Sequence, residues 1–452
     1  MSGVARLLQE AGWTISGSDE GFYPPVSLQL ERYGMDCLVG YRASNIPANT
    51  DLIVIGKHAK LVPEENEEVR AAFESGIPVK SFPEVLQDLC AETDNFVVAG
   101  SYGKSTCTAL LASVLVHAGK DPSYFIGAVP LDLPDNAHHG AGSAFVLEGD
   151  EYPSANWDAR PKFLFYHPHH LLLTSGEHDH INVYPTIESY LAPFKQLLAL
   201  DEIRDLTACL DGEHVQELIV ETQAPVHTYA LENPAADWRA ADMKPDGDFL
   251  SFTLLHHNEP VVTLKSLLLG RHNVQNIVGI SAMLLEAGAV TADELAAGVA
   301  AFTGVRQRLE RRTPTGGVPL YEDFGSSHAK LVAGIAAMRE QFPDRRLTVL
   351  FEPHTFTFRN REAIAWYDDL FKGADRVLVF APPSHGATDD QLTQAEIVDR
   401  VASTGIEAHP FGTKEELPDL LGPLDPNRDV LLVETSGGIG DSVPYLIDLL
   451  QK

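Results

Sequence analysis

Short apolar runs alternate with amphipathic segments along the N-terminal part of the chain. Apolar runs that are typical of strands lie at 14–19, 51–56 and 78–80, and helical patterns lie at 4–10, 27–33 and 64–75. Strands that alternate with helices pack as parallel, doubly wound sheets. This part of the chain therefore predicts an α/β domain.

The same alternation continues to the C-terminus and divides the chain further. A second α/β segment begins near residue 95, and a third begins with the apolar run 318–324. Further strands of the third segment are predicted at 347–351, 376–380 and 429–434. Because 452 residues are too many for one hydrophobic core, we predict three domains, at 1–93, 94–311 and 312–452.

The most informative stretch is 96–106, which reads Phe-Val-Val-Ala-Gly-Ser-Tyr-Gly-Lys-Ser-Thr before a helical pattern at 107–118. Backbone N–H groups of such a turn, with the helix N-terminus, bind phosphate oxygens. Lys104 is expected on the outer phosphates of a nucleotide, and the Ser105 hydroxyl on Mg²⁺. The predicted ATP-binding loop also contains Gly100, Ser101, Gly103 and Thr106.

A second candidate site follows the apolar strand at 144–147, where the chain continues Glu148-Gly149-Asp150-Glu151-Tyr152. ATP-binding folds place a Mg²⁺ ligand or a water-orienting acid at the end of such a strand. Taken alone, an acidic turn of this kind is usually a solvated surface loop. Together with the phosphate loop, it predicts Glu148 as a metal ligand.

Histidines gather in the following segment. The sequence Glu-His-Asp-His at 177–180 precedes a helical pattern at 186–199, and this combination of side chains suggests a hard or borderline metal ion. A structural zinc site is not favoured, because no cysteine lies nearby. The histidines at 167, 169 and 170 are interpreted as a surface loop without a function.

Two weaker motifs lie further along the chain. The stretch 269–276 contains Asn273 and Asn276 and is placed before a helix that ends at Glu286; asparagine side chains can pair with the edge of adenine. The stretch 304–310, interpreted as an arginine-rich helix end, includes Arg308 and offers guanidinium groups to a phosphate.

Composition excludes several classes of protein. The formal charge of −31 argues against sequence-independent nucleic-acid binding. No apolar run approaches the roughly 18 residues that a membrane span needs, and the first residues lack the features of a signal peptide. The 4 cysteines show neither paired spacing nor metal-ligand spacing, which predicts reduced thiols in a cytoplasmic protein.

In this order and at this spacing, the motifs resemble those of the Mur ligase family, the ATP-dependent amide-forming enzymes of peptidoglycan synthesis. The resemblance covers nearly the whole chain. A branch that attaches a tripeptide during cell-wall recycling is the most similar, and it is related to the branch that adds L-alanine. The finer match lies at 17–19 with 23–25, 125–130, 148–152 and 177–185, and the family motifs at 321–324, 351–354 and 436–440 are also similar.

The resemblance implies a Rossmann-like, UDP-sugar-binding sheet at 1–93, a P-loop ATPase-like domain at 94–311 and a Rossmann-like α/β ligase domain at 312–452. It also implies roles for single residues. Gly103, Lys104 and Ser105 would hold the triphosphate and Mg²⁺ with Glu148, and His180 would lie at a second metal ion. The remaining implied contacts are adenine for Asn273 and Asn276, a phosphate for Arg308, and the ribose for Asp323.

The implied reaction transfers the terminal phosphoryl group of ATP to the carboxylate of UDP-N-acetylmuramate. The amine of L-alanyl-γ-D-glutamyl-meso-diaminopimelate then attacks the acyl phosphate to give an amide. Two alternatives remain open: L-alanine as the amine donor, and a nucleotide-binding pseudoenzyme of the same fold. A generic P-loop NTPase would leave Asn273, Asn276 and Asp323 without a role.

The chain departs from the family pattern in three places. The family has a strand and a glycine-rich loop before the helix at 4–10; we expect a misassigned start codon, since true absence would remove a central strand and a diphosphate site. The family's Ala-His-His-Pro is Gly-Ser-Ser-His at 325–328, and its Thr-His-Gly-Lys-Thr is Ser-Tyr-Gly-Lys-Ser at 101–105. The hydroxyl that would bind the metal is retained.

Overall fold

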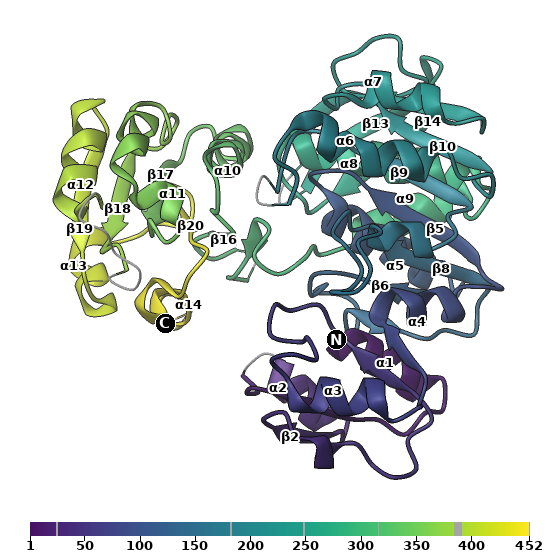
Figure 1. The fold of residues 1–452 in the computed structure, drawn as a ribbon. Helices are drawn as coiled ribbons and strands as arrows, with labels where there is room; N and C mark the ends of the chain where they lie inside the picture. Colours follow the sequence, from purple (N-terminus) through teal and green to yellow (C-terminus); the bar gives the residue numbers. More distant parts are fainter. Residues whose placement is uncertain (24–25, 181–182, 247–248, 315, 384–390, 452) are drawn as a thin grey trace. The chain divides into compact units, whose positions relative to one another are not determined.

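The computed structural model describes residues 1–23, 26–180, 183–246, 249–314, 316–383 and 391–451. The chain separates into two compact units (Figure 1). The first comprises Met1–Ala241, Thr253–Leu264 and Gln275–Phe302, and the second comprises Asp242–Phe252, Lys265–Val274 and Thr303–Lys452. No helix in the described ranges is long and apolar enough to cross a membrane.

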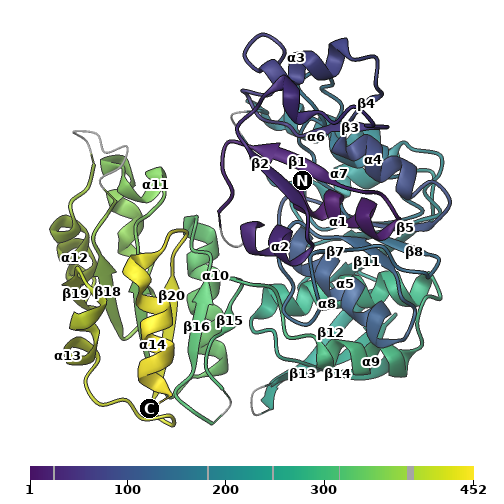
Figure 2. The same ribbon diagram turned by 90° about the horizontal axis from the view of Figure 1, so that it is seen from below.

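The N-terminal part of the first unit contains short parallel ladders (Figure 2). Strand β1 pairs with β2 and β3 pairs with β4, but no strand among the described residues joins the two ladders, so they do not form the single sheet that the alternation predicts. The elements are α1 (Ser2–Glu10), β1 (Ser16–Asp19), α2 (Val26–Arg32), β2 (Asp36–Val39), β3 (Ile53–Ile55), α3 (Glu67–Glu74), β4 (Val79–Ser81) and α4 (Phe82–Leu89).

Helix α1 follows directly from its sequence pattern. Val4, Leu7 and Leu8 recur at helical spacing and are buried, so one apolar stripe faces the interior. This stripe joins a large cluster that also contains residues of α4 and of the central sheet. The helix thereby attaches the N-terminal part of the chain to the central sheet.

The centre of the first unit is a sheet of 10 strands in the order β14-β13-β12-β11-β10-β9-β5-β8-β6-β7. Its neighbours β8, β5, β9 and β10 are parallel and buried, which explains their continuous apolar runs. The strands are β5 (Asp94–Ala99), β6 (Ser123–Phe125), β7 (Ala137–His138), β8 (Ala144–Glu148), β9 (His170–Leu173), β10 (Asp205–Cys209), β11 (Val226–Ala230), β12 (Trp238–Asp246), β13 (Phe249–His256) and β14 (Glu259–Ser266).

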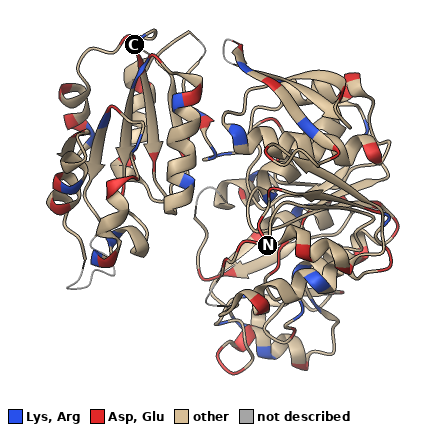
Figure 3. Cartoon of the chain, turned by 90° about the horizontal axis from the view of Figure 1, so that it is seen from above, with Lys and Arg blue, Asp and Glu red and all other residues tan. Residues whose placement is uncertain are grey.

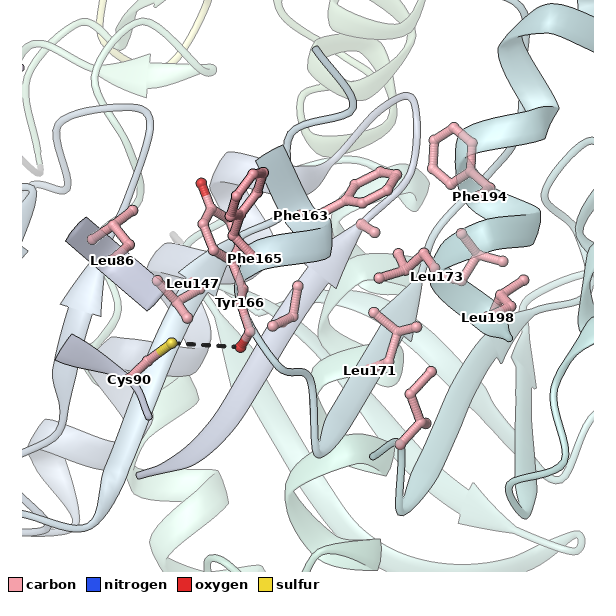
Figure 4. Close-up of a cluster of buried hydrophobic side chains, with 14 of the residues drawn as sticks. Leu86, Cys90, Leu147, Phe163, Phe165, Tyr166, Leu171, Leu173, Phe194 and Leu198 are labelled. Carbon is pink, nitrogen blue, oxygen red and sulfur yellow. Dashed lines mark hydrogen bonds between the residues drawn. The ribbon is translucent and has the colours of Figure 1, made fainter. Parts of the chain in front are cut away.

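One face of this sheet is covered by α1, α4, α6 and a short 3₁₀ segment at Lys162–Phe165. Figure 4 shows Leu171 and Leu173 of β9 beside Phe194 and Leu198 of α6, with Phe163 nearby. The helices of this part are α5 (Lys104–His117), α6 (Ile187–Leu198), α7 (Val215–Leu218), α8 (Arg271–Glu286) and α9 (Ala292–Ala301). The strands β5 and β8, whose carboxyl ends carry candidate site residues, are therefore anchored in a buried hydrophobic core.

The second unit is built on a sheet of 6 strands in the order β15-β16-β20-β17-β18-β19, all parallel except β15. Alternate residues of β20 enter two separate cores, because helices cover both faces. The elements are β15 (Glu310–Arg311), β16 (Leu320–Asp323), α10 (His328–Gln341), β17 (Arg346–Phe351), α11 (Phe356–Arg359), β18 (Arg376–Phe380), α12 (Gln394–Ser403), β19 (Glu407–Phe411), α13 (Leu417–Leu421), β20 (Asp429–Glu434) and α14 (Ser442–Leu450).

The α/β class and the parallel sheets are confirmed, whereas three local interpretations are wrong. Helix α8 begins at Arg271, so the asparagines of 269–276 lie in its first turns and not before it. The stretch 304–310 is a turn leading into β15 and not a helix end. His170 lies on β9, where it is buried, shares a 2.6 Å hydrogen bond with Asp205 and stacks on Phe96.

A buried pair of carboxyl groups lies beneath α10 in the second unit. Asp323 and Glu434 end adjacent strands in register. Glu434 is fully buried, and neither of its carboxyl oxygens has a hydrogen-bond partner among the described residues. Burial, and then the neighbouring Asp323, raise the pKa of Glu434 well above its usual range. Burial raises the pKa of Asp323 as well, but the N–H of Leu309 donates to Asp323, so Glu434, which has no such donor among the described residues, is the member of the pair that keeps its proton more readily.

This pair predicts a pH-dependent stability. A carboxyl group whose folded-state pKa is raised stabilises the fold fully below its unfolded-state pKa, and this contribution is lost as the pH rises toward the folded-state value. We expect the Glu434→Gln variant to be more stable than the parent, and by more at pH 8 than at pH 5, because the amide carries no proton to lose. Native-state hydrogen exchange of β16 and β20 measures these opening free energies.

The exposed Glu340 on α10 provides a matched control. The Glu340→Gln variant should show no pH-dependent difference from the parent. A gain in Glu434→Gln that is the same at both pH values would contradict the assignment of Glu434 as a buried neutral acid.

Candidate active site

The predicted phosphate loop joins β5 to α5, and its two glycines are required by its conformation. Gly100 and Gly103 have φ angles of +131° and +82°. A Cβ atom on Gly100 would lie 2.1 Å from Thr174 Oγ1, and one on Gly103 would lie 2.8 Å from Asn276 Oδ1. Because α5 begins at Lys104, the N–H groups of its first turn are directed toward this loop.

The Lys104 side chain is folded over the loop. Its ammonium group donates to the carbonyl oxygens of Gly100 and Ser101 and lies 3.2 Å from a carboxylate oxygen of Glu151. Only 13% of the Lys104 side chain is exposed, and that of Glu151 is fully buried. The positive charge is therefore held at the loop by a buried negative charge.

Glu151 is the centre of the site's polar network. One of its oxygens contacts Lys104, and the other lies 3.1 Å from His180 Nε2 and 3.4 Å from the Tyr190 hydroxyl oxygen. The Tyr184 hydroxyl donates to the Glu151 backbone carbonyl. Burial alone would raise the pKa of Glu151, but the hydrogen bond from His180 and the charge of Lys104 hold that pKa below its usual range.

Glu148 and Ser105 form a second pair at the same edge of the sheet. The Ser105 hydroxyl donates to Glu148 at 2.8 Å, and the Gly127 N–H donates to the other carboxylate oxygen at 2.7 Å. Burial raises the pKa of Glu148, although these two hydrogen bonds partly oppose the effect. Neighbouring oxygen ligands of octahedral Mg²⁺ lie about 3 Å apart, so this pair fits that ion as adjacent ligands.

A substitution at Glu148 tests this pair. We expect Glu148→Gln to raise the Mg²⁺ concentration for half-maximal ATP-dependent phosphate release at least about 10-fold, because an amide binds Mg²⁺ less strongly than a carboxylate. A titration of phosphate release with Mg²⁺ measures the change. The Ser105→Thr variant keeps the hydroxyl and is the matched control. Parental Mg²⁺ dependence in Glu148→Gln would remove Glu148 from the ligands.

The histidines of 177–180 do not converge on one point. Both ring nitrogens of His180 are engaged, Nε2 with Glu151 and Nδ1 with the Tyr152 hydroxyl at 2.9 Å. His178 instead shares a 2.8 Å hydrogen bond with the Tyr184 carbonyl. Within the described ranges, no group of three or more His, Cys, Asp or Glu side chains is arranged to hold a metal ion. A metal role for His180 stays a prediction. To bind a metal ion, the ring would have to give up its contact with Glu151 or its hydrogen bond with Tyr152.

The other predicted contacts with ATP are divided between the two units. Asn276 belongs to the first unit, where it lies against Gly103. Asn273, Arg308 and Asp323 belong to the second. There, the Asn273 amide donates to the Leu269 carbonyl, and the Arg308 guanidinium lies 5.1 Å from the Phe324 ring centroid. Their roles toward adenine, phosphate and ribose stay predictions.

Comparisons with known proteins identify the family of this chain. The description "Mur ligase family, catalytic domain" matches residues 1–93, and "Mur ligase middle domain" matches residues 98–284. An Escherichia coli (strain K12) protein named UDP-N-acetylmuramate–L-alanyl-γ-D-glutamyl-meso-2,6-diaminoheptandioate ligase is 30% identical, over 100% of this chain and 96% of its own length. This chain belongs to the Mur ligase family.

Other similar Mur ligases are named for a different amine donor, L-alanine. A UDP-N-acetylmuramate–L-alanine ligase of Burkholderia cenocepacia (strain HI2424) is 28% identical, over 100% of this chain and 96% of its own length. The solved UDP-N-acetylmuramate–alanine ligase from Thermotoga maritima has a TM-score of 0.78 at 21% identity and covers 100% of this chain and 97% of that chain, which shows a shared fold.

Membership of the Mur ligase family confirms the resemblance and the class of enzyme. The protein is an ATP-dependent amide-bond ligase of peptidoglycan metabolism. Members of the family use ATP and Mg²⁺. The structure adds residues to which the sequence patterns assigned no role, namely Glu151, Tyr152, Thr174 and Tyr190. Glu151 is the third acid of the stretch 148–151, and nothing local distinguishes it from Glu148.

Proposed function

We propose that this chain joins UDP-N-acetylmuramate to L-alanyl-γ-D-glutamyl-meso-diaminopimelate in the cytoplasm, using ATP and Mg²⁺. The observation that carries the proposal is the placement of Lys104, the Ser105–Glu148 pair and the Glu151–His180 pair around one phosphate loop. Positive charge, metal-binding oxygens and a titratable group are thereby available at one place, as phosphoryl transfer to a carboxylate requires.

The tripeptide is preferred to L-alanine because of a sequence motif, since overall identity does not separate the two donors. The E. coli relative that carries the tripeptide in its name aligns over the whole chain at 30% identity, and relatives named L-alanine ligases reach 30% and 31%. The Asp-Glu-Tyr of 150–152 matches the tripeptide branch, and Tyr152 binds His180 in the site. The second matching motif, Tyr-Pro-Pro at 23–25, has its prolines outside the described residues.

The chain's own residues bind and orient the reactants. The N–H groups of the loop and the first turn of α5 bind the phosphates, and Lys104 exchanges Glu151 for the terminal phosphates. Ser105 and Glu148 would hold Mg²⁺, which when bound neutralises the negative charge of the phosphates. Glu151 and Tyr190 keep Lys104 and Ser101 in place, since the Tyr190 hydroxyl donates to the Ser101 hydroxyl at 2.9 Å.

The reaction follows from this arrangement. The terminal phosphoryl group of ATP passes to the carboxylate of UDP-N-acetylmuramate, the amine displaces phosphate from the acyl phosphate, and an amide forms. In-line phosphoryl transfer depends mainly on positioning and neutralisation of charge. Lys104 supplies both at the phosphate loop.

The test is phosphate release by the purified chain with Mg-ATP and UDP-N-acetylmuramate, measured with the tripeptide, with L-alanine and with no amine. Release that requires the tripeptide supports the proposal. Release with L-alanine alone assigns the chain to the synthetic branch, which the names of relatives that are 28%, 30% and 31% identical favour. Silence with all three supports a nucleotide-binding pseudoenzyme.

A further inference from the structure

The second unit contains a pocket at the end of its sheet opposite to Asp323 and Glu434, which end β16 and β20. The adjacent parallel strands β16, β20 and β17 begin at Leu320, Asp429 and Arg346. Residues that precede these strands line the pocket, so it lies at the amino ends of the strands, and its volume is about 250 Å³. The lining includes Arg311, Pro319, Phe342, Arg345, Pro426 and Asn427, all of which belong to this unit.

Arg345 brings a positive charge to this pocket. Its guanidinium group lies 4.8 Å from the centroid of the Phe342 ring, and the residue is partly buried. Within the described ranges, Arg345 forms no ion pair and its side chain donates no hydrogen bond. The neighbouring Arg346 differs, because its guanidinium group lies 2.7 Å from Asp429. The charge of Arg345 is therefore available to a ligand.

Arg311 contributes a second guanidinium group from the end of strand β15. Its Nε donates to the Thr313 carbonyl at 3.0 Å, and its Nη2 donates to the Pro314 carbonyl at 3.2 Å. Both of these acceptors are uncharged. The two bonds hold the guanidinium group at the pocket, so a ligand that enters meets a positioned positive charge on this side as well.

The acidic residues near the pocket in sequence bind other groups or are exposed. Asp429 accepts hydrogen bonds from Arg346 and from the Asp425 N–H, and Asp425 accepts one from the Asn427 N–H. Asp344 is exposed and lines an adjoining pocket of about 240 Å³. In the chain, Asp and Glu outnumber Lys and Arg by 64 to 33 and lie throughout both units, so two guanidinium groups at one pocket depart from the overall charge (Figure 3).

The charge and the size of the pocket indicate the class of its ligand. Guanidinium groups present paired N–H donors that match the oxygens of a phosphate, and two of them balance the charge of a phosphate monoester, which is close to −2. Pockets for drug-sized ligands begin at about 300 Å³, so this smaller volume suits one phosphate group with little attached to it. The side-chain amide of Asn427 offers a further donor.

We propose that Arg311 and Arg345 bind a phosphate group in this pocket, either inorganic phosphate or a small phosphate monoester. The pocket is distinct from the phosphate loop, which belongs to the first unit, and from Asp323 at the other end of β16. An ATP-dependent amide ligase releases inorganic phosphate, so this anion is present at every turnover. The proposal does not depend on which amine donor the chain uses.

Phenylglyoxal, which modifies guanidinium groups, tests the pocket in the unaltered protein. Peptide mass spectrometry follows the modification rates of Arg311 and Arg345 while inorganic phosphate replaces chloride at constant ionic strength. We expect both rates to fall with one shared dissociation constant, and by about 10-fold when phosphate exceeds that constant 10-fold. Arg361, which is 50% exposed and paired with Glu396 in the same unit, is the control and should keep its rate.

A pair of variants provides a second measurement. In Arg345→Gln, we expect phosphate to protect Arg311 with at least about 10-fold weaker affinity, the loss of one charged hydrogen bond. Arg361→Gln is the matched variant, and its affinity should stay within about twofold of the parent, which is below that effect. ATP-dependent turnover should be parental in both variants, because neither arginine belongs to the proposed reaction site.

Glycerol 3-phosphate distinguishes the two sources of the phosphate group. Tighter protection by glycerol 3-phosphate than by inorganic phosphate assigns the pocket to a phosphate monoester, and the reverse order assigns it to the free anion. Modification rates of Arg311 and Arg345 that phosphate leaves unchanged overturn the proposal. Protection by acetate to the same extent, or equal protection of Arg361, also overturns it, because a phosphate-specific pocket then does not exist.

Discussion

Replacing Lys104 with alanine is expected to lower ATP-dependent phosphate release at least about 10³-fold, as for other cationic groups that neutralise a transferring phosphoryl group. The ammonium of Lys104 is the positive side chain bonded to the loop carbonyls of Gly100 and Ser101. Alanine removes that charge but leaves the two glycines and the start of α5 unchanged. Single-turnover phosphate release and circular dichroism of the same preparation give both readouts.

The matched control is Lys120→Ala. Lys120 follows α5 in sequence, and its half-exposed side chain is 3.9 Å from Glu294. We expect this variant to retain parental activity. Turnover of Lys104→Ala within a few-fold of the parent would show that the phosphate loop does not bind the nucleotide that reacts.

Replacing Glu151 with glutamine should reduce turnover by about 10²-fold, the scale of losing a charged hydrogen bond at a reacting centre. The carboxylate of Glu151 holds both Lys104 and His180, and the amide keeps its size without its charge. Removing one partner also leaves a buried charge poorly compensated, so we expect a lower melting temperature. Steady-state turnover and thermal unfolding measure the two effects.

The same variant changes the protonation of His180 in a defined direction. The hydrogen bond to Glu151 is the main reason that the pKa of His180 is raised. Without the carboxylate, His180 should lose its proton at a lower pH than in the parent, which an NMR titration of the ring protons detects. Glu177→Gln is the control, because Glu177 contributes its backbone carbonyl to the site. An unchanged His180 titration in Glu151→Gln would contradict the pairing.

The two substitutions separate what Lys104 does from what positions it. Lys104→Ala removes the charge that contacts the phosphates, and Glu151→Gln removes the group that holds that charge at the loop. A larger loss for Lys104 than for Glu151 is expected, because ATP can itself attract the ammonium once it is bound. The Tyr190 hydroxyl contacts both Ser101 of the phosphate loop and Glu151 of the stretch after β8, and so connects these two segments.

Sequence patterns predicted four strands of the second unit, β16, β17, β18 and β20, with small differences at their ends, and missed β15 and β19. The four predicted strands are buried on both faces of the sheet, so each contains a run of apolar residues, whereas β19 is partly exposed and carries polar residues. The N-terminal ladders were harder, because β2 is exposed along its whole length and lacks that signal. The interpretation of His170 as a surface-loop residue was wrong because its burial depends on contacts with Asp205 and Phe96 of neighbouring strands, which the local sequence does not show.

The amino-acid sequence by itself determined the family, the α/β class and the phosphate loop, because the chemistry of the loop is carried by the contiguous residues 100–106. Only the tertiary structure decided which acid of the loop 148–151 faces Lys104 and which faces Ser105. It also buried Glu434 beside Asp323. Such pairings depend on strand register and on how distant segments pack, and local sequence does not encode either.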